Sequence, residues 1–451
     1  LSEEGTIQEM TWTGPGTGPV TFAFRHDQYA GFAWHVCVDG QRHVKLPLSR
    51  VSPGSNQFAL TQDGIVYTLS YELQQGRLQV VASIENASGR VFAPQRALVN
   101  LGVDTEMVKY PQWRERFFPT LLRCERTHFW GYFMRPDGVV LGVASPDPVI
   151  SWAHGYNDGG HRLFTSCLDF LHTAPQPERH PRVPQSLAPG ELRQWRVWLV
   201  PLDSLAAVQP ALAHAAGIPM ITLDRPTVAE GQGVAGIVTS PVAVKSVSVR
   251  APDGESHEIE LRDGRFAFDT PQCGVYTITL TSQDGKVTEA KAARREPWSW
   301  YLKQARSNAV AKPQKASTHT ESWYGLFSGY IARKYFPDDA LDAAIDAKCA
   351  EVAPLMYDLA TLIPRFRRIQ NDACWASLLV DRYEATGDVR SLEFAAALAD
   401  YLVANQSPDG AYRNGDAHYT CVVYPAKSMM EVMAAEQPLA EKDPAWQARY
   451  D

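Results

Sequence analysis

The stretch that decides the fold of the C-terminal third reads DRYEATGDVRSLEFAAALADYLVANQSPDGAYR and spans residues 381–413. Apolar residues recur in it at three- and four-residue spacing, which predicts two amphipathic helices. Gly387 is typical of the end of a helix, and the pair Asp409 and Gly410 is typical of a turn with a positive φ angle. The stretch therefore predicts a helix, a short turn, a second helix and a second turn.

The same pattern recurs on both sides of this stretch. Helices are predicted at residues 322–336, 340–353, 372–385, 389–405 and 418–435. The first helix of each pair begins near Trp323, Trp375 or Tyr419, at separations of 52 and 44 residues, which is the spacing of a repeating helical hairpin. If successive hairpins pack side by side, the starting turns of their first helices face one mouth. We expect polar chemistry to collect at that mouth.

The residues before about 300 are punctuated like a β protein. Short runs rich in Val, Thr, Phe and Trp alternate with Asp-Gly turn signals. We predict a multidomain α and β protein with an antiparallel β-sandwich at 1–203, a helical connector at 204–220, an immunoglobulin-like β-sandwich at 221–296 and a helical domain at 297–451. The immunoglobulin-like module is interpreted as a spacer, with carbohydrate binding as the alternative. The polar segment 303–317 is interpreted as a linker or a loop.

Composition excludes several classes of protein. The chain has 451 residues, 45% of them hydrophobic and 21% charged, and a net charge of −7. These values are typical of globular proteins, and the absence of a basic excess argues against nucleic-acid binding. No apolar run reaches the ~18 residues of a membrane-spanning helix. The seven cysteines include no Cys-x-x-Cys pair, so the sequence predicts neither a disulfide scaffold nor a zinc site. Because the chain starts at Leu1, we expect a removed signal peptide or a trimmed chain, and a secreted or periplasmic location.

Two stretches resemble carbohydrate-active enzymes. Residues 381–413 resemble the helical hairpin of (α/α)-toroid enzymes. The segment SPDPVISWAHGYNDGGHRLFTSCLDFLHTAPQPERHP (145–181), followed by LAPGELRQWRVWLVPL (187–202), resembles the β-supersandwich that accompanies some of these toroids. The order supersandwich, immunoglobulin-like module and toroid resembles the polysaccharide lyase family of L-rhamnose-α-1,4-D-glucuronate lyases. A closed toroid of six hairpins at about 50 residues each needs roughly 300 residues, and only about 130 follow His319. The toroid is therefore expected to be incomplete here, and either the chain continues beyond Asp451 or part of the site comes from elsewhere.

The resemblance implies a carbon–oxygen lyase that cleaves a rhamnose–glucuronate linkage in plant arabinogalactan by β-elimination at the uronate. This reaction requires a partner for the carboxylate, a base for the C5 proton and an acid for the leaving O4 oxygen. We expect His418 or Tyr419 to act as base and acid, with Arg413 and Asn371 holding the carboxylate and Tyr324 as a further catalytic candidate. For Arg413 the alternative is a surface ion pair, and for Asn371 it is helix capping.

The candidate substrate-binding residues come from both halves of the chain. Trp323 and Trp375 could stack on a sugar, with core packing as the alternative. Asp372 is a further candidate at the mouth. A glycine-flanked loop of the sandwich contributes His154, Tyr156 and His161, with a solvated loop as the alternative. The sequence implies no required cofactor and leaves the metal ligands unknown, although a divalent cation such as calcium could bind through Asp147, Asp158 and carbonyl oxygens.

Two other functions compete with the lyase. A glycoside hydrolase on the same scaffold would need two carboxylates about 5 to 10 Å apart, for which the candidates are Glu321, Asp372, Asp409 and Asp416. A non-catalytic glycan-binding protein would use the same surfaces without turnover. The expected partner under the leading hypothesis is a uronate-containing plant glycan, and neither a nucleic acid nor a membrane span is expected.

Overall fold

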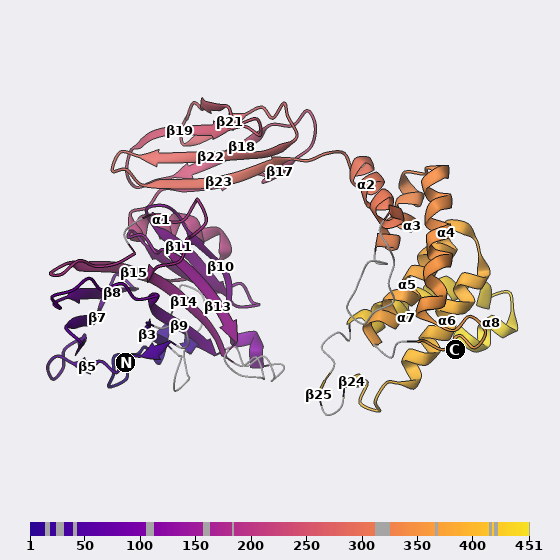
Figure 1. The fold of residues 1–451 in the computed structure, drawn as a ribbon, viewed down its shortest axis with the longest axis horizontal. Coiled ribbons are helices and arrows are strands. Elements are labelled where there is room, and N and C mark those ends of the chain that lie inside the picture. The colour runs from indigo at the N-terminus through magenta and orange to yellow at the C-terminus, as the bar shows by residue number, and fades with distance from the viewer. Residues whose placement is uncertain are drawn as a thin grey trace. The chain divides into compact units, whose positions relative to one another are not determined.

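The computed structural model of the protein describes residues 1–13, 19–23, 31–38, 43–104, 112–156, 163–182, 185–311, 325–365, 369–414, 417–418 and 423–450. These residues form two compact units, Leu1–Arg295 and Glu296–Asp451. The first unit is built of β-strands and the second of helices (Figure 1). The change of composition near residue 300 thus coincides with a change of architecture.

The first unit begins with a large sandwich of two antiparallel sheets. One sheet has the strand order β10–β11–β12–β15–β8–β7–β6–β5, and the other has the order β13–β14–β9–β3–β4. The strands of the larger sheet are β5 (Ser49–Arg50), β6 (Gln57–Gln62), β7 (Ile65–Gln74), β8 (Arg77–Asn86), β10 (Phe118–Cys124), β11 (Phe129–Met134), β12 (Val140–Ser145) and β15 (Leu192–Leu202). Those of the smaller sheet are β3 (Gly31–Cys37), β4 (Val44–Lys45), β9 (Arg96–Asp104), β13 (Ser151–Tyr156) and β14 (Leu163–His172). A separate ribbon pairs β1 (Glu9–Trp12) with β2 (Val20–Ala23), and η1 (Gln112–Glu115) is a short 3-10 helix.

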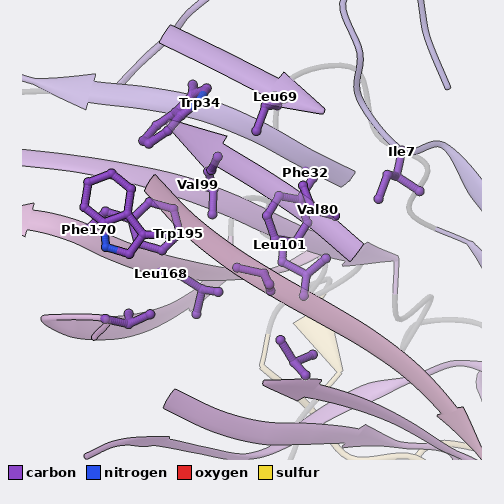
Figure 2. Packing of buried hydrophobic residues seen from close by; sticks show 14 of the residues in the cluster. Ile7, Phe32, Trp34, Leu69, Val80, Val99, Leu101, Leu168, Phe170 and Trp195 are labelled. Carbon is purple, nitrogen blue, oxygen red and sulfur yellow. The ribbon is translucent and has the colours of Figure 1, made fainter. Parts of the chain in front are cut away.

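Aromatic side chains from the two sheets interlock in the core of this sandwich. Phe170 of the smaller sheet stacks on Trp195 of the larger sheet, with ring centroids 4.6 Å apart and an interplanar angle of 8°. Trp34 meets both rings edge-on, at 5.6 Å from Phe170 and 6.4 Å from Trp195 (Figure 2). Strand β7 alternates buried and partly exposed residues, as expected for a strand with one face on the core. Burial of such large side chains is the main stabilising term of the sandwich.

A connector and a second sandwich complete the first unit. The connector comprises η2 (Leu205–Ala207) and α1 (Val208–Ala216), which ends at Gly217 in the left-handed conformation. Leu212 of α1 packs so closely on Gly142 of β12 that a Cβ atom there would lie 2.7 Å from the leucine. The second sandwich pairs the sheet β16–β18–β21 with the sheet β17–β23–β22–β19–β20. Its strands are β16 (Met220–Leu223), β17 (Thr227–Val228), β18 (Val234–Thr239), β19 (Val244–Arg250), β20 (Ser256–Glu258), β21 (Arg265–Phe268), β22 (Gly274–Ser282) and β23 (Val287–Arg294).

Buried polar side chains join the two sandwiches. Glu125 is fully buried and accepts hydrogen bonds from the Arg123 guanidinium at 2.9 and 3.0 Å and from the Glu289 backbone N–H at 3.2 Å. His128, also fully buried, lies 3.3 Å from the Thr288 hydroxyl, which donates to the Pro219 carbonyl at 2.5 Å. Glu125, His128 and Thr288 thus all have polar partners, and these buried contacts attach the immunoglobulin-like module to the large sandwich.

The second unit consists of helices paired into hairpins. They are α2 (Trp298–Ala311), α3 (Gly325–Tyr335), α4 (Asp339–Met356), α5 (Ile369–Thr386), α6 (Val389–Ala404), α7 (Val423–Ala440) and α8 (Pro444–Tyr450), with a small ribbon of β24 (Arg413–Asn414) and β25 (Ala417–His418) before α7. Two expectations were wrong. Residues 298–311 form helix α2, although 303–317 was interpreted as a linker or loop, and the helix expected at 418–435 starts at Val423 because His418 belongs to the ribbon.

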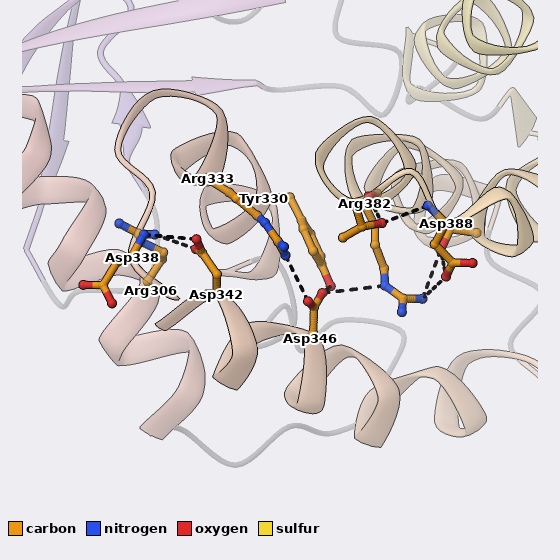
Figure 3. A network of polar contacts seen from close by, with 10 residues as sticks. Arg306, Tyr330, Arg333, Asp338, Asp342, Asp346, Arg382 and Asp388 are labelled. Atoms are coloured by element: carbon orange, nitrogen blue, oxygen red, sulfur yellow. Dashed lines mark hydrogen bonds and ion pairs between the residues drawn. The ribbon is translucent and has the colours of Figure 1, made fainter. Parts of the chain in front are cut away.

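Ion pairs cross-link these helices. Arg306 of α2 is 2% exposed and donates to Asp342 of α4 at 2.7 Å. Asp346 of α4 accepts hydrogen bonds at 2.9 Å from both Tyr330 and Arg333 of α3 (Figure 3). Asp346 also lies 3.8 Å from Arg382 of α5, whose guanidinium reaches Asp388 at the start of α6 at 3.3 Å. These ion pairs link α2, α3, α4, α5 and the start of α6 to one another.

The predicted fold class, antiparallel sandwiches followed by a helical region, is confirmed.

Candidate active site

The starting turn of α5 carries two buried polar residues. Asn371 is 1% exposed and Asp372 is 2% exposed. Since α5 begins at Ile369, both lie within the first turn, so neither occupies the N-cap position that the capping alternative requires. Their side chains are enclosed in the helical unit, where burial of a polar group is costly unless it is hydrogen-bonded.

Asp372 is the most perturbed carboxyl group of this region. Burial raises its pKa from 3.8 to about 8. The starting turn of a helix favours a negative charge, but the loss of solvation outweighs that effect here. Its Oδ2 atom is buried and has no hydrogen-bond partner among the described residues. At neutral pH the carboxyl is therefore mostly protonated and can donate a hydrogen bond.

Asp169 of the sandwich shows the contrast with a carboxylate that is fully paired. It is 1% exposed, yet its Oδ1 atom accepts hydrogen bonds from Arg96 at 2.6 and 3.1 Å. Its Oδ2 atom accepts a hydrogen bond from the Ser151 hydroxyl. A buried carboxylate with a structural role is normally held in this way. Asp372 lacks such an arrangement among the described groups, which makes it a functional candidate.

Contacts between α5 and α7 show that these helices run in the same direction. The Ser428 hydroxyl of α7 donates to the Ala373 carbonyl of α5 at 2.5 Å and lies 2.9 Å from the Ser377 hydroxyl. Further along both helices, the charge of Glu431 acts on Asp381. Since the contacts advance together along the two sequences, the starting turns of α5 and α7 lie at the same end. This is the arrangement that a shared mouth requires.

The ribbon before α7 brings two predicted catalytic residues to one position. Arg413 and His418 are direct partners in the antiparallel pairing of β24 and β25. The ribbon is anchored at its base by Tyr412, which is 2% exposed and donates from its hydroxyl to the Leu402 carbonyl of α6 at 3.1 Å. Arg413 and His418 are thus neighbours in space as well as near in sequence, at the approach to the start of α7.

Other predicted residues have different surroundings. Trp375 is 1% exposed and packs in the helical core, with its ring centroid 6.3 Å from that of Tyr357, which favours the core-packing alternative. His154 and Tyr156 lie in strand β13, where they pair with Ser166 and Phe164. The expectation that these two belong to a loop was wrong, because the ladder with β14 extends through both. The predicted residues Tyr324, Tyr419, Trp323 and His161 lie outside the described residues.

The carboxylates predicted for ion binding (Asp147 and Asp158) and for a hydrolase (Glu321, Asp409 and Asp416) either have other partners or lie outside the described residues. Asp147 accepts hydrogen bonds from the Arg196 guanidinium at 2.7 and 3.0 Å and from the Arg196 backbone N–H at 2.8 Å. Asp158, Glu321 and Asp416 lie outside the described residues. Asp409 caps its own turn by accepting from the Ala411 N–H at 3.2 Å. Within the described ranges, no group of three or more His, Cys, Asp or Glu side chains is arranged to hold a metal ion.

A cavity of about 560 Å³ lies in the large sandwich. Its lining is mainly apolar, with Leu46, Ile65, Tyr67 and Phe92 among the buried or partly buried residues and Arg90 among the exposed ones. It contains none of the predicted site residues. We therefore place the candidate active site at α5 and the ribbon.

The comparisons with known proteins concern mainly the fold. Residues 229–293, in the immunoglobulin-like module, match a family described as a domain of unknown function (DUF8816). No curated protein matches the chain by sequence. The whole chain is similar to 73% of the solved structure of a polysaccharide lyase, BACCELL_00875, with a TM-score of 0.69 and 13% identity.

A second solved structure matches far more weakly. It is a family 76 glycoside hydrolase from a bovine Bacteroides thetaiotaomicron strain, with a TM-score of 0.21 and 13% identity over 49% of this chain and 64% of that chain. A likeness of this size carries no structural argument. No helix within the described ranges is both long and apolar enough to cross a membrane. The TM-score of 0.69 to the solved polysaccharide lyase shows that the chain shares its overall fold with that protein.

Proposed function

We propose that this protein degrades glycans as a polysaccharide lyase. Its substrate would be a uronate-containing plant glycan, cleaved by β-elimination at the rhamnose–glucuronate linkage of arabinogalactan, in a secreted or periplasmic location. The fold supports the broader part of this proposal, because the whole chain resembles a solved polysaccharide lyase. Since a fold hosts many reactions, the chemistry must be argued from the site.

The observation that carries the proposal is the burial of the Asp372 carboxyl in the first turn of α5, next in sequence to Asn371, which raises the pKa of Asp372 and favours its neutral form. Removal of the C5 proton from a uronate spreads negative charge onto the substrate carboxylate, which must be stabilised as the charge develops. A protonated carboxyl group and a side-chain amide both donate hydrogen bonds, and neither repels an anion. Asp372 and Asn371 are therefore suited to hold the substrate carboxylate at the point where charge accumulates.

The base would come from the ribbon before α7, and the acid from residues that precede α7 or α3 in sequence. We assign His418 as the base for the C5 proton and Tyr419 or Tyr324 as the acid for the leaving O4 oxygen. Arg413, opposite His418 in the ribbon, would add a positive charge near the substrate carboxylate. Trp323 would supply a face for the sugar.

The remaining assignments concern other predicted residues. We assign glycan contacts to His154, Tyr156 and His161 of the sandwich, and only a supporting role in the helical unit to the buried Trp375. Because neutral donors and Arg413 can stabilise the carboxylate, the proposed reaction requires no metal ion. Treatment with EDTA should leave the rate unchanged, and a loss of activity restored by calcium would contradict this part of the assignment.

Absorbance tests the proposed reaction directly. Elimination creates a conjugated uronate that absorbs at about 235 nm, whereas hydrolysis creates none, and the reaction class must be decided by such a product. We expect this absorbance to rise when the protein is incubated with a plant-gum arabinogalactan. The variant Asp372→Ala should lose most of the rate, and Asp409→Asn, which alters a turn carboxylate of the same unit, should not. New reducing ends without absorbance would establish a hydrolase, and binding without either product would establish a glycan-binding protein.

A further inference from the structure

Helix α2 opens with three adjacent aromatic side chains that are exposed. Trp298 is 60% exposed, Trp300 is 46% exposed and Tyr301 is 40% exposed. The Tyr301 ring lies 6.0 Å from the Trp298 ring and meets the Trp300 ring edge-on at 5.1 Å. We call these three residues the α2 aromatic patch. The Tyr301 ring packs against both indole rings, and the three rings together present angled apolar faces.

The patch is not part of the packed face of α2. The buried residues of this helix are Arg306 and Ala309, which lie further along the chain. A single exposed aromatic residue is ordinary on a protein surface, but a cluster of them usually marks a binding surface. Keeping three large rings partly in water also forgoes hydrophobic stabilisation that burial would supply. The cluster therefore calls for a ligand that would cover it.

We propose that the α2 aromatic patch binds pyranose rings of the glycan outside the catalytic site. This inference rests on the proposed function, because it takes the ligand to be the same class of polymer. The patch contains rings and no aliphatic side chain, and flat aromatic faces fit the apolar C–H face of a sugar ring. The indole N–H groups and the Tyr301 hydroxyl are suited to hydrogen bonds with sugar hydroxyls at the ring edges.

The size of the patch favours a sugar over a protein partner. Three aromatic side chains that are about half exposed offer roughly 300 Å², given about 200 Å² for each ring. A stable protein interface buries about 800 Å² on each partner. One or two sugar rings can cover the patch, whereas a protein would need a much larger surface around it.

Affinity electrophoresis in gels that contain plant-gum arabinogalactan tests the proposal without requiring turnover. We expect the triple variant Trp298→Ala, Trp300→Ala and Tyr301→Ala to bind the polymer at least tenfold more weakly, which corresponds to about 1.4 kcal/mol. The control Tyr335→Ala removes a 70% exposed aromatic residue from the end of α3 and should bind like the wild type. On a short oligosaccharide substrate, the triple variant should keep the wild-type kcat/KM.

A second variant separates ring stacking from a packing role. Replacing Trp298 and Trp300 by Phe keeps the flat rings, so polymer binding should stay within about twofold of wild type. Binding by the alanine variant that equals wild type would refute the proposal. So would loss of binding in the phenylalanine variant, or a fall in melting temperature that accounts for the alanine result. A wild-type protein that binds the polymer and yields no product at about 235 nm would refute the lyase and leave the patch intact.

Discussion

The variant Asp372→Asn separates the proposed role of this residue from every role that transfers its proton. With a pKa of about 8, the Asp372 carboxyl is roughly 90% neutral at pH 7 and roughly 10% neutral at pH 9. If the neutral form is required, the activity of the wild type should fall about tenfold between these pH values. The amide of asparagine has nearly the same shape, donates a hydrogen bond and does not titrate. The variant should therefore retain activity at pH 7 within about tenfold of wild type and lose this alkaline decline.

The same substitution should also change the free energy of unfolding, and by an amount that depends on pH. Because the folded state holds the Asp372 proton more tightly than the unfolded state does, stability is greatest below the unfolded pKa of 3.8 and falls as the pH rises towards 8. The slope is about 1.4 kcal/mol per pH unit for one proton. Asparagine removes this penalty, so the variant should become more stable than wild type by a few kcal/mol at pH 8 and by much less at pH 5.

Initial rates on arabinogalactan and urea unfolding, each measured across this pH range, test both expectations. The matched variant Asp372→Ala should lose about 100-fold or more in rate, because it has no donor. An Asp372→Asn variant without activity at any pH would refute the argument, since it would show that the proton itself is transferred, as in a hydrolase. A stability difference that does not change between pH 5 and pH 8 would show that the carboxyl is ionised in the folded protein.

Three further changes test what stabilises each of the two units. Burial lowers the pKa of His128 to about 3, so stability should be full above pH 6.5 and decline as the pH falls towards 3; His128→Gln should flatten that decline in thermal melts. Arg306→Ala leaves a buried carboxylate without its 2.7 Å partner and should cost about 3–5 kcal/mol in urea unfolding, whereas Arg265→Ala, which removes an exposed pair with Asp224, should cost less than about 1 kcal/mol. Gly131→Ala would place a Cβ atom 2.4 Å from the Leu121 carbonyl oxygen and should destabilise the sandwich by about 2 kcal/mol, while Gly89→Ala, which meets no atom within 4 Å, should have little effect.

The sequence predicted the architecture because its signals are local. Alternation marks β7, and apolar spacing with the Gly387 stop marks the hairpin of α5 and α6. Helix α2 was missed because its buried face includes Arg306, a charged residue whose burial depends on Asp342 in another helix. No local pattern reports a partner 36 residues away. The start of α7 was misplaced for a similar reason, since the ribbon depends on the pairing of Arg413 with His418, which helical periodicity does not encode.

Parts of the candidate site were predictable, and others were not. The first turn of α5 could be identified because the polar pair Asn371 and Asp372 opens an apolar helix. Its burial could not, since enclosure depends on helices distant in sequence. The side-by-side placement of α5 and α7 rests on the contact of Ser428 with Ala373, which periodicity does not encode. The repeat of hairpins nevertheless implied that starting turns would gather at one end, as they do for α5 and α7.

The helical unit departs from the usual distribution of polar and apolar residues at two places. The Oδ2 atom of Asp372 is buried without a hydrogen-bond partner among the described groups, and Trp298, Trp300 and Tyr301 are 40–60% exposed. Each departure lowers stability, so neither is explained by folding alone. One supplies a neutral donor for an anion, and the other supplies flat apolar faces for a ring. A uronate-containing glycan has both a carboxylate and sugar rings. One class of ligand therefore accounts for both the buried carboxyl group and the exposed aromatic rings.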